Sequence, residues 1–124
     1  MSATETTPSK SSFTIYHNPR CSKSRQALEL LRERGKDPKV VEYLKDAPSA
    51  ARVKELIDLL GVPPHELLRK GEAPYKELGL SKDSSKAEVA KAIAEYPILL
   101  ERPVVVAGKR ALIARPPERV LELF

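Results

Sequence analysis

Residues 13–25 read Phe-Thr-Ile-Tyr-His-Asn-Pro-Arg-Cys-Ser-Lys-Ser-Arg, and this stretch determines both the start of the fold and its chemistry. It opens with β-forming side chains, is interrupted at Asn18-Pro19, and continues as a helical pattern from Ser22. The single cysteine of the chain, Cys21, lies at this junction. Because free backbone N–H groups at a helix N-terminus favour an anion, the position favours a thiolate.

The charges around Cys21 favour the same state. A lone cysteine is more often a small buried apolar residue than a reactive one. Here no carboxylate follows Cys21 before Glu29, and four basic or titratable residues lie close to it in sequence: His17, Arg20, Lys23 and Arg25. Thiols at helix N-termini beside cations titrate at roughly 3.5–7.5, well below a free thiol. The flanking residues therefore favour a reactive thiolate over a structural cysteine.

The composition predicts one globular domain over residues 13–124. Residues 1–12 are rich in Ser and Thr, lack the apolar segment of a secretory signal, and are expected to be a disordered lead-in. No apolar run is long enough to cross a bilayer. One cysteine cannot form an internal disulfide, so we expect a reducing compartment and a cytoplasmic location.

The net charge of +5 suits a small anionic ligand. Nucleic acid is not an expected partner, because the basic residues are scattered and aromatic residues make up only 5% of the chain. No membrane partner is expected either. One cysteine and two separated histidines do not supply a metal ligand set, so we predict no metal. A bound organic cofactor is not expected either.

The first elements form a β-α-β pattern. Residues 14–16 predict a strand, residues 22–34 a helix with apolar positions at 27, 28, 30 and 31, and residues 39–44 a second strand. Gly35 stands where a left-handed helix cap is needed. Such a unit favours parallel strands joined by a right-handed crossover.

Residues 49–96 are predicted to be entirely helical. Ser49 caps a helix that Gly61 ends, Pro63-Pro64 begin a short helix over residues 65–69, and residues 73–80 form a helical turn or a loop. Ser85 and Glu88 have the spacing of a capping box, which opens a helix to about residue 96. His65 has no evident partner and is expected on a helix surface.

Two strands and a helix complete the chain. Residues 103–106 and 111–113 predict a hairpin with glycine in its turn, and residues 118–124 a helix that buries Val120, Leu121 and Phe124. The order predicts an α/β fold: a thioredoxin-like four-stranded mixed sheet with a helical insertion, about residues 49–96, between the second and third strands. Pro103 opens the third strand, and its preceding peptide bond is either cis or trans.

Several further motifs make the chain resemble the glutaredoxin-coupled arsenate reductase (ArsC) family of the ArsC/Spx superfamily, which has a thioredoxin-like fold. They are residues 15–19 before Cys21, Ser24-Arg25 after it, residues 67–70, 74–80, 97–99 and 102–106, and Arg115-Pro116. The chain departs from the pattern of the best-known arsenate reductases at Arg20, Ser22 and Lys23.

The resemblance implies a role for each site residue. Cys21 is the expected nucleophile. Three arginines are expected to bind an oxyanion: Arg69, Arg102 and Arg115. A single arginine is usually a surface residue, but guanidinium forks suit a tetrahedral oxyanion. His17 either helps to keep the thiolate ionised or is a neutral hydrogen-bonding group. The other expected supporting residues are Asn18, which braces the loop, and Ser24, Arg25 and Pro103.

The implied function is the reduction of arsenate to arsenite through a covalent arseno-cysteine on Cys21. Because the chain has no second cysteine, an external thiol must resolve this adduct, and the resemblance implies glutathione as co-substrate followed by glutaredoxin. Two alternatives remain. One is a glutathione-dependent thiol reductase with another substrate. The other is an Spx-like regulator that binds RNA polymerase, although Ser24 stands where a Cys-x-x-Cys redox switch has its second cysteine.

Overall fold

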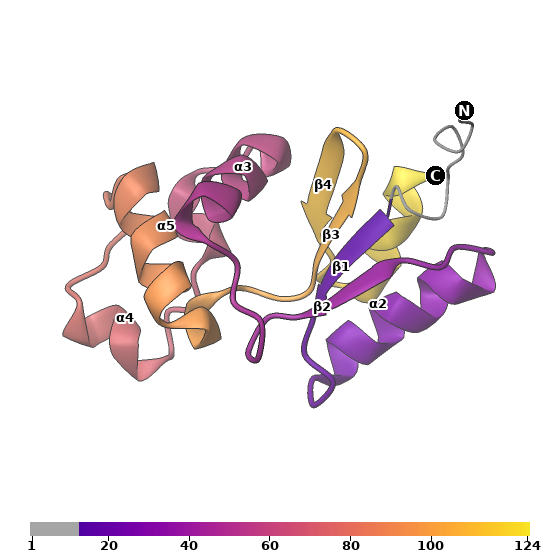
Figure 1. Ribbon diagram of the computed structural model, residues 1–124, viewed down its shortest axis with the longest axis horizontal. Coiled ribbons are helices and arrows are strands. Elements are labelled where there is room, and N and C mark those ends of the chain that lie inside the picture. Colours follow the sequence, from indigo (N-terminus) through magenta and orange to yellow (C-terminus); the bar gives the residue numbers. More distant parts are fainter. Residues whose placement is uncertain (1–12) are drawn as a thin grey trace. The chain divides into compact units, whose positions relative to one another are not determined.

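The computed structural model describes residues 13–124, so the expected lead-in of residues 1–12 lies outside the described part. The chain forms two compact units (elements labelled in Figure 1). One consists of the described residues up to Glu42 together with Arg102–Phe124, and the other is Tyr43–Glu101. The grouping of residues 13–124 into a single domain stays a prediction.

The first unit is built on a four-stranded sheet. Its strands are β1 (Phe13–His17), β2 (Lys39–Glu42), β3 (Val104–Ala107) and β4 (Arg110–Ile113), in the order β2-β1-β3-β4. β1 and β2 are parallel, whereas β1–β3 and β3–β4 are antiparallel. The mixed sheet confirms the predicted fold class. Strand β2 ends at Glu42, two residues before the predicted end of the second strand at residue 44.

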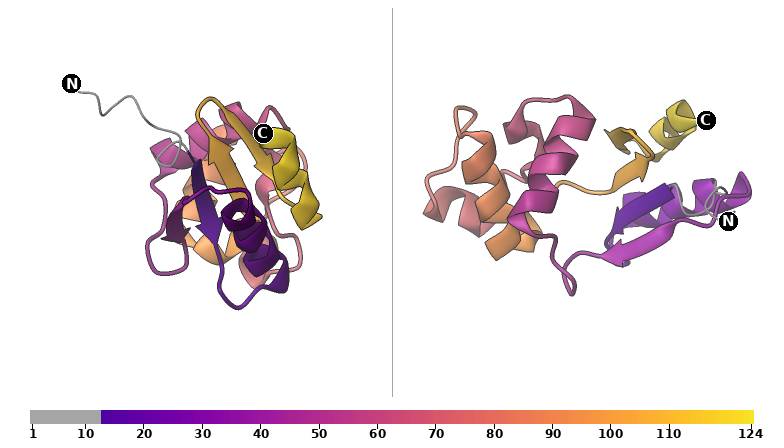
Figure 2. Two further views of the ribbon diagram at one scale, coloured as in Figure 1. Left: turned by 90° about the vertical axis from the view of Figure 1, so that its right-hand side faces the viewer. Right: turned by 45° about the horizontal axis from the view of Figure 1, so that its top comes forward.

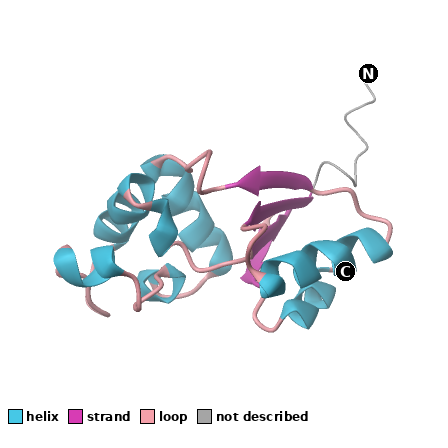
Figure 3. Cartoon of the chain, turned by 90° about the horizontal axis from the view of Figure 1, so that it is seen from below, coloured by secondary structure: helices cyan, strands magenta, loops and turns pink. Residues whose placement is uncertain are grey.

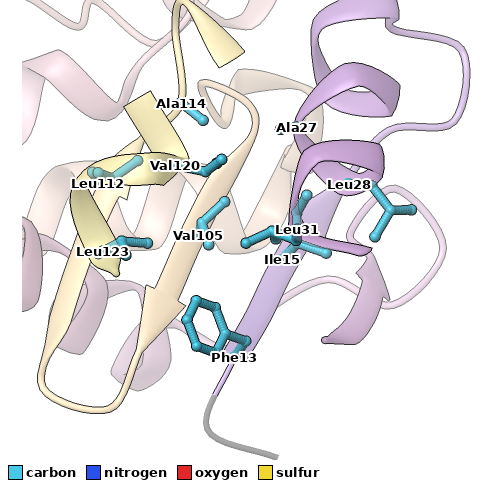
Figure 4. Close-up of a cluster of buried hydrophobic side chains, with 10 residues drawn as sticks. All are labelled: Phe13, Ile15, Ala27, Leu28, Leu31, Val105, Leu112, Ala114, Val120 and Leu123. Carbon is cyan, nitrogen blue, oxygen red and sulfur yellow. The ribbon is translucent and has the colours of Figure 1, made fainter. Parts of the chain in front are cut away.

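Helix α2 (Ser22–Glu33) connects β1 to β2, as the β-α-β pattern predicted. Gly35 follows the C-cap residue Arg34, and its φ of +79° allows the N–H of Lys36 to reach the carbonyl of Leu31 at 3.0 Å. The apolar side of α2 belongs to a cluster of ten buried side chains (Figure 4). The other members come from the sheet and from residues 114–123. This cluster is the core that packs the middle of α2 against the sheet.

The helix predicted at the C-terminus is present as η3 (Pro117–Leu123), and it is a 3₁₀ helix. It lies with α2 beside the sheet (Figure 3). In a 3₁₀ helix, positions three apart share one side, so Val120 and Leu123 are buried. The prediction that Phe124 belongs to the buried side is wrong, because its side chain is 49% exposed.

The second unit is helical, as predicted for residues 49–96. It contains α3 (Ala50–Leu60), η1 (Pro64–Leu67), α4 (Ala73–Glu77), α5 (Lys86–Glu95) and η2 (Pro97–Leu99). Ser49 caps α3 and Ser85 forms the predicted capping box with Glu88. Helices α3 and α5 lie side by side (Figure 2). No helix within residues 13–124 has the length and apolar character needed to cross a membrane.

Candidate functional site

A tight loop connects β1 to α2 and carries the thiol. The N–H of Cys21 donates to the carbonyl of Asn18 at 2.9 Å, and the N–H of Arg20 donates to the Asn18 side-chain oxygen at 3.0 Å. Arg25, one turn into the helix, donates from Nη1 to the carbonyl of Pro19 at 2.9 Å. Asn18 and Arg25 therefore brace the loop from both ends.

Cys21 is the N-cap residue of α2 and is half-buried. Partial burial raises the pKa of the Cys21 thiol, but the backbone N–H of Ser24, the positive charge of Arg102 and the backbone N–H of Lys23 together lower it below its ordinary value. The Arg102 side chain also lowers this pKa as a hydrogen-bond donor. The site thus stabilises a thiolate by the helix N-terminus and one arginine.

His17 is buried, with only 5% of its surface exposed, and its Nδ1 shares a hydrogen bond of 2.6 Å with the hydroxyl of Ser24. Burial lowers the pKa of His17; Glu42 opposes this change, whereas Arg32 and Arg25 add to it. A lowered pKa means a neutral imidazole near pH 7. Of the two roles left open by the sequence, the geometry favours the neutral hydrogen-bonding group.

The pairing of β1 with β3 explains how Arg102 reaches the loop. Tyr16, at the end of β1, is opposite Val104, at the start of β3. In antiparallel strands the residues before Val104 therefore lie beside those after Tyr16. The Arg102-Pro103 bond is cis, which resolves the alternative that the sequence left open.

Arg115 lies next to Arg102 in the same unit. Its Nη1 donates to the carbonyl of Arg102 at 3.2 Å, and its side chain is exposed. The N–H of Ala114 donates to the carbonyl of Pro103 at 2.9 Å, so the two segments run together. Arg115-Pro116 is a second cis bond, which was not predicted. The structure thus places Arg115 beside Arg102, the arginine that acts on Cys21.

Arg69 belongs to the second unit, just after η1. Its N–H donates to the carbonyl of Leu99 at 2.8 Å, and its guanidinium forms an ion pair of 3.0 Å with Glu72. Glu72 was not among the predicted site residues, although its three-residue spacing from Arg69 is a usable signal. That Arg69 meets the same anion as Arg102 and Arg115 stays a prediction.

His65 in η1 does have a partner, contrary to the sequence expectation. Its Nε2 shares a hydrogen bond of 2.8 Å with the hydroxyl of Tyr75 in α4, and the two rings meet edge to face. Residues ten apart along the chain give no local signal for such a pair. This contact connects the two elements that flank the Arg69 segment.

Comparison with known proteins identifies the family of the chain. The model of the ArsC family matches residues 16–123. The chain belongs to the ArsC family. The ArsC-family chain is 52% identical over 112 residues to the uncharacterized protein YfgD of Escherichia coli, covering 88% of this chain and 93% of that protein. It is 43% identical to an arsenate reductase of Haemophilus influenzae, with coverage of 91% and 99%.

A solved structure carries the same fold. The arsenate reductase from Vibrio cholerae superposes on the ArsC-family chain with a TM-score of 0.85 and 44% sequence identity, covering 90% of this chain and 97% of that one. The chain therefore has the thioredoxin-like ArsC architecture over almost its whole described length.

Proposed function

We propose that this chain is an arsenate reductase in which Cys21 is the nucleophile. The observation that carries the proposal is the lowered pKa of Cys21 at the N-cap of α2, beside the Arg102 guanidinium. A thiolate at neutral pH is the form that attacks. Family membership supports the choice of arsenate, because relatives that cover most of the chain carry the name arsenate reductase.

The first step joins sulfur to arsenic. The Cys21 thiolate attacks the arsenic atom of arsenate, a sulfur–arsenic bond forms, and hydroxide or water leaves. Arsenic remains As(V) in this arseno-cysteine, so no electrons have been transferred. Arg102 and Arg115 neutralise the oxyanion and its adduct, and we assign the same role to Arg69 from the second unit. Guanidinium groups stabilise the charge on the arsenate oxygens as the bond forms.

The second stage needs two electrons from outside the chain. Cys21 is the only cysteine, so no internal thiol can supply them. Two external thiols supply one electron pair and become joined as a disulfide. The sulfur–arsenic bond breaks, arsenic leaves as arsenite, As(III), and Cys21 returns as a thiolate. We assign these thiols to glutathione, as co-substrate, and to glutaredoxin.

His17 has a positioning role in this proposal. It is buried and bonded to Ser24, whose backbone N–H helps to lower the pKa of Cys21. A neutral imidazole holds the loop and the first turn of α2 in register, so that the N–H groups remain directed at the sulfur. We also assign a positioning role to Pro103, which joins Arg102 to the first residue of β3, Val104.

The test is coupled turnover with arsenate, glutathione, glutaredoxin, glutathione reductase and NADPH. Arsenate-dependent loss of NADPH is expected for the unaltered chain and is abolished in Cys21→Ser. A matched variant, Ser22→Ala, changes the adjacent exposed position and retains turnover. Turnover that persists in Cys21→Ser would overturn the mechanism. Loss of NADPH that does not depend on arsenate but needs Cys21 would favour the thiol reductase of another substrate.

A further inference from the structure

An open groove of about 730 Å³ lies along one side of α2 in the first unit. The loop before Cys21 contributes His17 and Pro19 to its lining, and one face of α2 contributes the remaining residues. His17 and Leu28 are its buried members, and its other lining residues are exposed. Its volume lies within the roughly 300–1,000 Å³ of sites for small molecules.

The groove carries charges of both signs. Arg25 and Arg32 lie two helical turns apart, with Glu29 between them and Glu33 one turn beyond Glu29. Within residues 13–124, none of the ion pairs involves Glu29, Arg32 or Glu33. Two guanidinium groups and two carboxylates do not suit a multiply charged oxyanion, which the glutamates would repel. They suit a ligand that carries carboxylates and an ammonium group together.

The groove begins close to the nucleophile. Pro19 lines the groove and is two residues from Cys21, so the two Cα atoms are at most about 7 Å apart. Arg25 donates a hydrogen bond to the Pro19 carbonyl and also lines the groove. An extended tripeptide spans about 10 Å by the same chain dimensions, enough to reach from the groove to the loop.

We infer that this groove binds the external thiol as a small zwitterionic thiol peptide of the glutathione class. Such a peptide has two carboxylates and one ammonium group, which match the two arginines and the glutamates. Its central cysteine then lies toward Cys21. The inference rests on the proposed function, because the need for an external thiol follows from the single cysteine of the chain.

The test is the rate at which oxidised glutathione modifies Cys21, measured by intact mass. The Cys21 thiolate attacks one sulfur of the disulfide, a Cys21–glutathione disulfide forms, and one glutathione thiolate leaves. The comparison reagent is bis(hydroxyethyl) disulfide, which reacts in the same way but carries no charge. This assay contains no arsenate, so its outcome is independent of whether the chain reduces arsenate.

The double variant Glu29→Gln with Arg32→Gln removes groove charges and leaves the loop intact. We expect the rate with oxidised glutathione to fall about tenfold, which corresponds to the loss of one or two charge-assisted bonds. The rate with the uncharged disulfide should change less than about twofold. The matched control neutralises an exposed pair of the same spacing on α3, Arg52→Gln with Glu55→Gln, and should not alter either rate. The single variant Arg32→Gln should show a smaller selective loss.

Two results would overturn the inference. One is an equal loss of rate with both disulfides, because the variant would then act through the reactivity of Cys21 and not through binding. The other is an unchanged rate with oxidised glutathione in the double variant. The coupled arsenate assay tests the proposed function separately, and its failure would leave the selective effect of the groove charges intact.

Discussion

The hydroxyl oxygen of Ser24 lies 2.6 Å from Nδ1 of His17, and both side chains are buried. The same oxygen accepts the backbone N–H of Asn18 at 3.0 Å. Ser24 also supplies a backbone N–H that lowers the pKa of Cys21. One residue in the first turn of α2 therefore connects the end of β1 to the surroundings of the thiol.

Ser24→Ala should lower the stability of the fold. The substitution leaves buried His17 and the Asn18 N–H without this partner, so the free energy of unfolding should fall by about 1–3 kcal/mol. Urea denaturation measures the change. Ser22→Ala is the matched control, because Ser22 is exposed, and it should stay within about 0.5 kcal/mol of the unaltered chain. Equal stability of the two variants would contradict the role of the buried hydroxyl.

Arg102→Gln should raise the pKa of Cys21. The guanidinium favours the thiolate through its charge and as a hydrogen-bond donor, and glutamine retains only part of the second effect. The rate of Cys21 alkylation against pH should therefore shift toward higher pH. Arg20→Gln changes an exposed arginine of the same loop and serves as the control. An identical shift in both variants would mean that general surface charge, not Arg102, sets the thiol pKa.

The stability of the fold should fall as the pH drops below about 6.5, the usual pKa of an unfolded histidine. Burial, the largest cause, lowers the pKa of folded His17, so the unfolded chain binds more protons in this range. The stabilisation is complete above the unfolded pKa and is lost toward the lower folded pKa. Urea unfolding at a series of pH values measures this slope.

His17→Gln should reduce the slope between pH 7.5 and about 5.5, although it lowers the overall stability. The control, His65→Gln, removes a histidine that is only part-buried and bonded to Tyr75. If His17→Gln keeps the full slope, another group is responsible for the loss of stability in acid.

Glu72→Gln should strengthen oxyanion binding. The Glu72 carboxylate lies 3.0 Å from the Arg69 guanidinium and, under the proposed function, competes with arsenate for it. We expect the KM for arsenate to fall about threefold, with less than about 1 kcal/mol change in the free energy of unfolding, since the pair is partly exposed. Glu55→Gln breaks the similar pair with Arg52 and should leave KM unchanged. An increased KM would mean that Glu72 positions Arg69 for the anion.

Local signals predicted most of the elements. The cap at Gly35, the N-cap at Ser49 and the capping box at Ser85 each depend on residues within one helical turn, and the structure has all three. The buried side of the C-terminal helix was wrongly predicted at Phe124, because η3 is a 3₁₀ helix in which Val120 and Leu123, three positions apart, are buried. The His65–Tyr75 contact was missed because it joins two separate elements.

The position of Cys21 at a helix N-terminus followed from the sequence alone, because a strand, a turn and a helix start are encoded within residues 13–25. Only the tertiary structure decided which cation acts on the thiol. Several basic residues are closer to Cys21 in sequence, yet Arg102 lowers its pKa. The reason is the antiparallel register of β1 with β3, in which Tyr16 faces Val104 and the chain before β3 returns to the thiol loop.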